Sequence, residues 1–141
     1  MGLFSSLFSS KPRVKPSGKK EFIILIGAAK FEVMVTQEEH YQAALETICG
    51  PRAPRGVNRF ETAYLKLEDK IPRDPNAVRV EMRGKQVGYL RPQAAISYRQ
   101  YLITKGMPKA NGQCQAVVRG GWVSSDGRKG LYEIWLDFPA L

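Results

Sequence analysis

The sequence has few of the residues on which metal sites and enzymes depend. It contains one histidine and two cysteines among 141 residues, and Cys49 and Cys114 stand far apart without Cys-x-x-Cys spacing. A zinc site needs more ligands than these residues readily offer, so we expect no metal and no other cofactor. Two distant cysteines are typical of reduced thiols in a cytoplasmic protein.

Catalytic signatures are also missing. The sequence has no Gly-x-Ser-x-Gly elbow, no Walker A loop and no His-Glu-x-x-His pair, which mark several hydrolase and nucleotide-hydrolysing classes. We therefore expect a protein that is not an enzyme. A small hydrolase built on His40 and Asp74, or on His40 and a cysteine, is the weaker alternative, because only the presence of these residues supports it.

Long hydrophobic runs are absent and acidic residues are unevenly placed. No run of about eighteen apolar residues occurs, so we expect no transmembrane helix. The net charge is +9, yet residues 1–20 hold five basic residues and no acidic one, which leaves 17 basic and 13 acidic residues in the rest. Residues 1–20, rich in Ser, Pro, Gly and Lys, predict a flexible basic leader, and residues 21–141 predict a single domain.

The first residues of the leader admit a second interpretation. They formally fit a myristoylation pattern, and the apolar side chains of Leu3, Phe4, Leu7 and Phe8 could touch a membrane surface. The basic residues follow this apolar patch, which is unlike a secretory signal. We expect a flexible tail and no membrane partner, with a membrane role for the leader as the weak alternative.

Period-two alternation of apolar residues predicts most of the remaining elements. The strand patterns cover residues 22–26 (as a buried strand), 31–35, 59–68, 77–82, 86–90, 114–119 and 131–138. A helix is predicted from a capping box at Thr36 and Glu39 to Gly50, and another from Pro92 to Gly106. Strands that do not alternate regularly with helices indicate a mainly β (α+β) fold, a small antiparallel β-barrel of about six strands with two α-helices.

The segment from Ile71 to Leu90 carries the most information. Asp74-Pro75-Asn76 is a turn sequence, because proline fixes φ and the flanking side chains bond nearby backbone. Residues 77–82 alternate as a half-buried strand, Gly84-Lys85 is the predicted two-residue hairpin turn, and residues 86–90 return as the second strand. The sequence therefore predicts a β-hairpin that follows directly on a polar turn.

This segment resembles the core of the HIRAN domain family. D-x-N-A-V-x-V begins at Asp74 and G-x-x-V-G-Y-L begins at Gly84, and Glu39-His40-Tyr41-Gln42 and Ala94-Ala95-x-x-Tyr98 agree with the family as well. The resemblance covers residues 31–138. The family occurs in helicase-like transcription factor and related remodellers and as a small stand-alone bacterial protein, and it implies an OB-like barrel with inserted helices.

The resemblance also implies a binding site for the 3′-hydroxyl end of single-stranded DNA. Asp74 matches the acidic residue that accepts a hydrogen bond from the terminal hydroxyl. Tyr41 and Tyr89 match aromatic contacts, and His40 stands where the family has another aromatic residue. Trp122 is aligned with a late aromatic residue of the family.

Two positions depart from the family pattern. Glu39 replaces an arginine, and its charge disfavours a phosphate there. Arg73 replaces an aromatic residue next to Asp74, although a guanidinium can stack on a base or pair with a phosphate. These departures bear on 3′-end capture more than on the fold.

The residues themselves support binding in a general way. Aromatic faces stack on unpaired bases while lysine and arginine neutralise phosphates, and a carboxylate among them would accept a hydrogen bond from a hydroxyl and reject a phosphate. Three alternatives remain open from the residues alone. Asp74 can merely cap its own turn through Asn76, Tyr64 and Tyr98 have the spacing of core residues, and Trp135 lies in a strand of which either face could be buried.

We expect a cytoplasmic, bacterial or phage DNA-binding module that recognises single-stranded 3′ ends in DNA repair or replication-fork processing. Its expected site residues are His40, Tyr41, Arg73, Asp74, Tyr89 and Trp122. A helicase or nuclease would be its protein partner, and the basic leader would add salt-sensitive affinity. The rival function is a protein-interaction adaptor that uses an exposed sheet edge or the aromatic patch of the same barrel.

Overall fold

A computed structural model describes residues 21–69 and 74–141. The predicted leader (residues 1–20) and Arg73 lie outside these ranges. In chain order the elements are β2 (Phe22–Ile24), β3 (Val33–Thr36), the 3-10 helix η1 (Glu38–Tyr41), α1 (Gln42–Cys49), β4 (Val57–Leu67), β5 (Val78–Met82), β6 (Lys85–Leu90), α2 (Pro92–Thr104), β7 (Asn111–Gly120) and β8 (Tyr132–Leu136).

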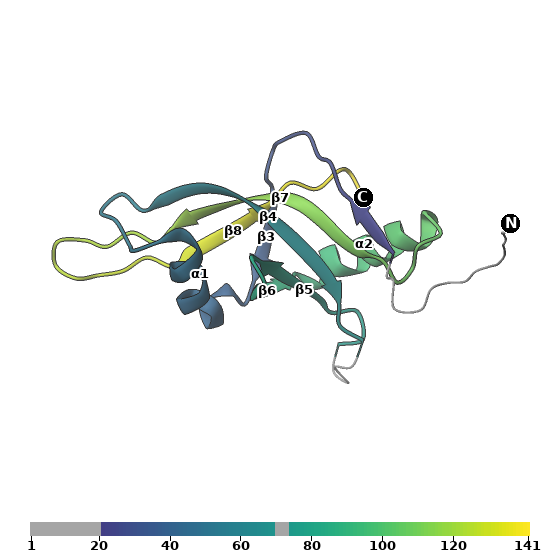
Figure 1. The fold of residues 1–141 in the computed structure, drawn as a ribbon, viewed down its shortest axis with the longest axis horizontal. Coiled ribbons are helices and arrows are strands. Elements are labelled where there is room, and N and C mark those ends of the chain that lie inside the picture. Colours follow the sequence, from purple (N-terminus) through teal and green to yellow (C-terminus); the bar gives the residue numbers. More distant parts are fainter. Residues whose placement is uncertain (1–20, 70–73) are drawn as a thin grey trace, which may run out of the picture.

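Six of the strands close into an antiparallel barrel. Their order is β7-β4-β5-β6-β3-β8, and the last strand, β8, also pairs with the first, β7, which closes the barrel. The seventh strand, β2, runs parallel to the first residues of β7. Figure 1 shows α1 and α2 toward opposite ends of the long axis of the molecule. The predicted mainly β barrel with two helices is confirmed, and no helix in the described ranges is long and apolar enough to cross a membrane.

The barrel interior is filled by the alternate residues that the sequence pattern marked as apolar. Along β5 and β8 every second side chain is buried, as period-two patterning requires. The helices add residues at helical spacing from one face each. The principal core side chains of these four elements are Val78, Val80, Met82, Tyr132, Ile134, Leu136, Leu45, Ile48, Tyr98 and Leu102.

The β5–β6 hairpin turns one residue earlier than predicted. Met82 pairs with Lys85, so the two turn residues are Arg83 and Gly84, and both have positive φ values, 49° and 77°. Two positive φ values are the requirement of a type I′ turn. The guanidinium of Arg83 donates to the carboxylate of Glu61 at 3.1 and 3.2 Å, which holds a non-glycine residue in this conformation.

The first helix also begins differently from the prediction. Thr36 does not cap it, because its backbone is paired with Tyr89 in the β3–β6 ladder. Gln37 is the residue before the helical segment, with φ of 64° and no side-chain cap bond. A 3-10 turn then comes before α1, which begins only at Gln42. The predicted capping box is therefore wrong.

Strand β2 is not the buried strand that was predicted. Only Ile23 and Leu25 turn toward the core. Phe22, Ile24 and Ile26 keep 46%, 58% and 79% of their surface exposed. Tyr64, which has the spacing of a core residue in the sequence, also points outward, whereas Tyr98, with the same kind of spacing, is fully buried.

Candidate nucleic-acid interface

Four elements meet around a pocket that contains two of the predicted site residues. The end of β3, the turn before β5, the end of β6 and the start of α2 enclose a volume of about 290 Å³. The pairing of Thr36 with Tyr89 brings the ends of β3 and β6 together. The lining residues are Thr36, Gln37, Asp74, Ala77, Tyr89, Leu90 and Pro92.

Asp74 is held in place by the turn that it caps. Its Oδ1 accepts the backbone N–H of Asn76 at 3.1 Å, and its carbonyl oxygen accepts the N–H of Ala77 at 3.2 Å. The interpretation of Asp74 as a turn former is thereby confirmed. A carboxylate has about four acceptor positions, so a residue that lines the pocket keeps acceptor capacity for a ligand hydroxyl.

Tyr89 is placed by an irregularity in β6. The β5–β6 register shifts between Val80 and Glu81, which is the mark of a β-bulge. Gly88 has φ of +154°, and a Cβ atom there would lie 2.5 Å from Cγ1 of Val35. A residue without a side chain thus lets β6 approach β3 closely, immediately before Tyr89 turns to the pocket.

A group of polar side chains surrounds Tyr89, and a second predicted residue, Tyr41, lies near this group. The hydroxyl of Tyr89 donates to Oε2 of Glu68 at 3.1 Å, and Nη1 of Arg79 lies 3.9 Å from Oε1 of that carboxylate. Burial is the main cause that raises the pKa of Tyr41, and the neighbouring Tyr89 and Glu68 raise it further, through a side-chain hydrogen bond with Tyr89 among other effects. The two tyrosines are therefore neighbours, but Tyr41 does not line the Asp74 pocket.

Two other predicted residues lie outside this pocket. The exposed imidazole of His40 has Nε2 3.9 Å from Oε2 of Glu39 and does not line the pocket. Trp122 follows β7, whose last residue Gly120 pairs with the first residue of β4. Asp74 follows the other end of β4, and the 11 residues of β4 span about 35 Å when extended. Trp122 and Asp74 therefore lie at opposite ends of this strand.

The start of α2 adds a feature that the sequence analysis did not assign to the site. Arg91 is the N-cap residue, no side chain caps the helix, and Pro92 opens it. The first-turn amides of Gln93 and Ala94 have no acceptor within the helix, which makes this end partially positive. Pro92 indicated the helix start in the sequence. No local signal indicated that the ends of β3 and β6 lie beside this helix start.

A second hollow of about 410 Å³ lies across the start of α2 from the first. It shares β3 and α2 with the Asp74 pocket and ends at Trp135, whose ring centre is 5.9 Å from the guanidinium carbon of Arg119. Trp135 is half-buried, so its strand presents the indole outward. The lining residues are Glu32, Val33, Met34, Arg91, Gln93, Ala94 and Trp135.

The charge around the site is mixed. Burial is the main cause that raises the pKa of Glu38, and the charges of Glu39 and Glu133 add to the rise while that of Arg91 opposes it. Acidic groups thus gather around Glu38, and Arg91, whose charge acts on Glu38, lies at the start of α2 beside the free amides. An anion is favoured at the start of α2 and disfavoured beside Glu39.

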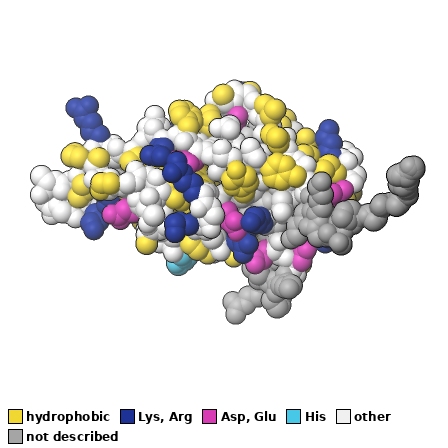
Figure 2. Space-filling model, viewed as in Figure 1, with side chains coloured by type: hydrophobic (Ala, Val, Ile, Leu, Met, Phe, Trp, Pro, Cys, Tyr) yellow, Lys and Arg dark blue, Asp and Glu magenta, His cyan; other side chains and the backbone are white. Residues whose placement is uncertain are grey.

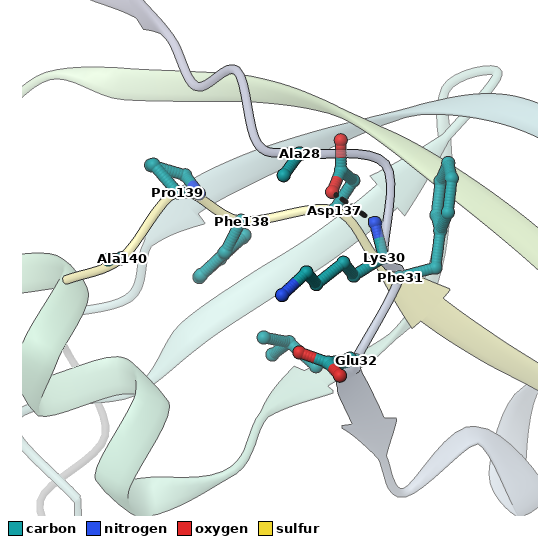
Figure 3. Close-up of a pocket in the computed structure, with 9 residues that line it drawn as sticks. Ala28, Lys30, Phe31, Glu32, Asp137, Phe138, Pro139 and Ala140 are labelled. Carbon is teal, nitrogen blue, oxygen red and sulfur yellow. Dashed lines mark hydrogen bonds between the residues drawn. The ribbon is translucent and has the colours of Figure 1, made fainter.

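A third hollow, of about 310 Å³, contains none of the predicted site residues. It lies beside the segment that connects β2 to β3, where Oδ1 of the buried Asp137 accepts the N–H of Lys30 at 3.2 Å. Figure 3 shows this bond and the ring of Phe31 pointing away from the Lys30 ammonium. Phe31 packs instead on Phe60, with ring centres 5.5 Å apart. Asp137 therefore has a structural role in this connection.

No group of three or more His, Cys, Asp or Glu side chains suited to a metal occurs within residues 21–69 and 74–141. Comparison of the chain with family models, with curated proteins and with solved structures finds no match. The arrangement in the Asp74 pocket, a carboxylate beside an oriented tyrosine and an uncapped helix start, is suited to binding a polar, partly aromatic and anionic ligand.

Proposed function

We propose that this chain is a single-stranded DNA-binding module that receives a 3′-hydroxyl end in the pocket of Asp74 and Tyr89. The observation that carries the proposal is that the turn and the bulge place these two side chains in one pocket. Its volume of about 290 Å³ is near the lower limit for small-ligand sites. It therefore suits a single terminal group better than a duplex.

Each part of a terminal nucleotide has a counterpart in the pocket or beside it. Asp74 accepts the hydrogen bond of a 3′-hydroxyl and repels a 3′-phosphate. Tyr89 and Tyr41 offer ring faces to unpaired bases, and the bond to Glu68 restrains the orientation of Tyr89. The preceding phosphate lies at the start of α2, where the free amides and Arg91 favour an anion.

The biological setting belongs to the same proposal. The chain has no catalytic step of its own and holds a strand end for a helicase or nuclease during DNA repair or replication-fork processing. It acts in the cytoplasm of a bacterial or phage-infected cell. The basic residues of the leader add affinity that falls with salt and does not depend on sequence.

Fluorescence anisotropy with three oligonucleotides tests the proposal. One strand ends in a 3′-hydroxyl, one in a 3′-phosphate, and one is closed so that it has no free end. We expect the 3′-hydroxyl strand to bind at least about tenfold more tightly than the other two, since a lost charged hydrogen bond costs about 1.5–3 kcal/mol. Equal binding of all three would refute end recognition, and no binding at low salt would refute the DNA-binding function.

Variants of Asp74 separate its charge from its turn. Asp74→Asn keeps an oxygen that can accept the N–H of Asn76, so we expect a folded protein that binds 3′-phosphate better than the wild type does. Asp74→Ala loses both the acceptor and the turn bond. Asp126→Asn is the matched control, because Asp126 accepts the N–H of Arg128 in the same two-residue pattern but lies in the loop between β7 and β8. A 3′-hydroxyl preference that survives in both Asp74 variants would contradict the assigned role.

A further inference from the structure

The positive charge of the described residues is concentrated at the end of the molecule opposite the Asp74 pocket. Residues 50–59, which lead from α1 into β4, and residues 119–131, which lead from β7 to β8, contain six of the fifteen described basic residues and one of the thirteen acidic ones. The other described residues contain nine basic and twelve acidic ones. Figure 2 shows Lys and Arg side chains at the end of the molecule where the β7–β8 loop lies in Figure 1. We call residues 50–59 and 119–131 the basic tip.

The two segments of the basic tip are joined to each other by backbone contacts. Ala53 forms a parallel bridge with Trp122, and the N–H of Val123 donates to the carbonyl oxygen of Ala53 at 3.0 Å. The guanidinium of Arg52 donates to the carbonyl oxygen of Gly130. The basic side chains of both segments therefore belong to one surface. They are Arg52, Arg55, Arg59, Arg119, Arg128 and Lys129.

Acidic residues offset only part of this charge. Arg59 pairs with Glu61 at 2.6 Å, and Arg128 pairs with Asp126 at 3.0 Å. Glu133 lies across the β7–β8 ladder from Arg119. With these three acidic residues counted, the surface still has an excess of three positive charges. The basic residues of the tip that have no ion pair among the described residues are Arg52, Arg55, Arg119 and Lys129.

The chemistry of the basic tip favours a phosphate backbone over unpaired bases. Trp122 is the one aromatic residue of the two segments, and its Nε1 edge lies against Gly130, where a Cβ atom would be 2.0 Å from it. Sites for single strands place several aromatic side chains under successive bases. Duplex DNA carries one negative charge per about 1.7 Å of its axis, about twice the density of one strand. A cluster of arginine and lysine with few stacking groups therefore complements a duplex best.

We propose that the basic tip binds the phosphate backbone of double-stranded DNA without sequence preference. Arg55, Arg119 and Lys129 pair with phosphate oxygens, and the guanidinium groups can do so through two parallel hydrogen bonds. The contact goes beyond the proposed end recognition and does not depend on it, because the tip and Asp74 lie at opposite ends of β4. The 11 residues of β4 span about 35 Å when extended, which is about ten base pairs of DNA.

Fluorescence anisotropy of the full chain with a DNA dumbbell tests the inference. The dumbbell is a duplex closed by a loop at each end, so it offers no 3′ end to the Asp74 pocket. We expect binding that weakens as salt is added, because phosphate contacts release counterions. The double variant Arg55→Gln/Lys129→Gln should lower the slope of log affinity against log salt concentration by about two units.

A second double variant controls for the loss of charge alone. Lys105→Gln/Lys109→Gln also removes two exposed positive charges, but these lie just beyond the end of α2, and we expect the wild-type slope. All four side chains are exposed, so both variants should keep the wild-type melting temperature. In NMR spectra the indole signal of Trp122 should shift when the dumbbell is added.

Four results would overturn the inference. They are an absence of binding to the dumbbell at low salt, an unchanged slope in Arg55→Gln/Lys129→Gln, an equal loss in the Lys105→Gln/Lys109→Gln control, and tighter binding of a closed single strand of the same number of nucleotides. Asp74→Asn separates this inference from the proposed function, because it should bind the dumbbell as the wild type does. End recognition can thus fail while the basic tip still binds a duplex, and the reverse also holds.

Discussion

Glu61 shows how a single buried charge can link stability to pH. Its carboxylate is 7% exposed and lies 2.6 Å from Nε of Arg59, and Arg83 donates two further hydrogen bonds to it. Burial alone would raise the pKa of Glu61, but the bonds and charges of the two arginines outweigh burial, and the pKa lies below its ordinary value of 4.5. As pH falls, Glu61 is therefore protonated at a higher pH in the unfolded chain than in the folded protein.

Glu61→Gln should consequently destabilise the protein near neutral pH and not in acid. The stability contributed by Glu61 is present above about pH 4.5 and is lost as pH falls through the lower folded pKa. We expect a loss of about 2 kcal/mol at pH 7 in urea unfolding, with the curves of wild type and variant converging as pH falls through the lowered folded pKa of Glu61. Glu46→Gln serves as control, because Glu46 is an exposed carboxylate on α1, and a constant difference from pH 7 to pH 3 in Glu61→Gln would contradict the argument.

Gly88 tests whether a single backbone position sets the geometry of the pocket. A methyl group at this residue would contact Val35 at 2.5 Å and the carbonyl oxygen of Thr36 at 2.6 Å. We expect Gly88→Ala to cost about 2 kcal/mol or more and to weaken binding of the 3′-hydroxyl strand, since Tyr89 must move with β6. Gly127→Ala is the control with φ of +88° and open space around it, and it should cost only about 1 kcal/mol.

At the scale of elements, helix α2 fixes the turn that carries Asp74. Arg99 donates to the carbonyl oxygens of Asn76 and Ala77 at 3.0 and 2.8 Å, and to Asp69 at 3.0 Å. A planar guanidinium can make all of these bonds at once, and an ammonium cannot. The helix thereby positions both its own first turn and the opposite wall of the pocket.

Arg99→Lys should therefore reduce DNA binding although Arg99 does not line the pocket. We expect a loss of about 1–2 kcal/mol in stability and a smaller ratio between the affinities for 3′-hydroxyl and 3′-phosphate ends, measured by anisotropy. Lys109→Met is the matched control, because Lys109 bonds the same Asp69 carboxylate at 3.3 Å but donates none of the hydrogen bonds that hold the turn. A specificity ratio that stays unchanged in Arg99→Lys would show that the helix does not position Asp74.

The elements themselves were largely readable from the sequence, because their signals are local. The alternation of Val78, Val80 and Met82 and the proline at residue 92 correctly gave a strand and a helix start. Errors arose where a distant partner decides the outcome. Thr36 pairs with Tyr89 instead of capping a helix, and Glu61 holds Arg83 in the hairpin turn. Nothing near Phe22 indicates that its strand has one face on the outside.

At the scale of the whole molecule, closure of the barrel decides which predicted site residues meet. The pairing of β6 with β5 and β3 brings Tyr89 beside the Asp74 turn and the end of β3, and η1, which contacts β6, brings Tyr41 near Tyr89. The antiparallel pairing of β4 with β7 carries Trp122 to the other end of the molecule. Strand order depends on pairings between distant segments, so a sequence pattern alone could not separate Trp122 from the others. The same reasoning explains why the start of α2 and Trp135 were not foreseen as parts of one surface.

The most direct test of the central claim is a map of backbone amide shifts by NMR when a short single strand with a 3′-hydroxyl end is added. The account predicts that the largest changes fall on Asn76, Tyr89 and the first-turn amides of α2, Gln93 and Ala94. The indole of Trp122 should be unaffected, and a strand with a 3′-phosphate should produce smaller changes at the same amides. Shifts centred on Trp122, or equal shifts with both strands, would contradict the account.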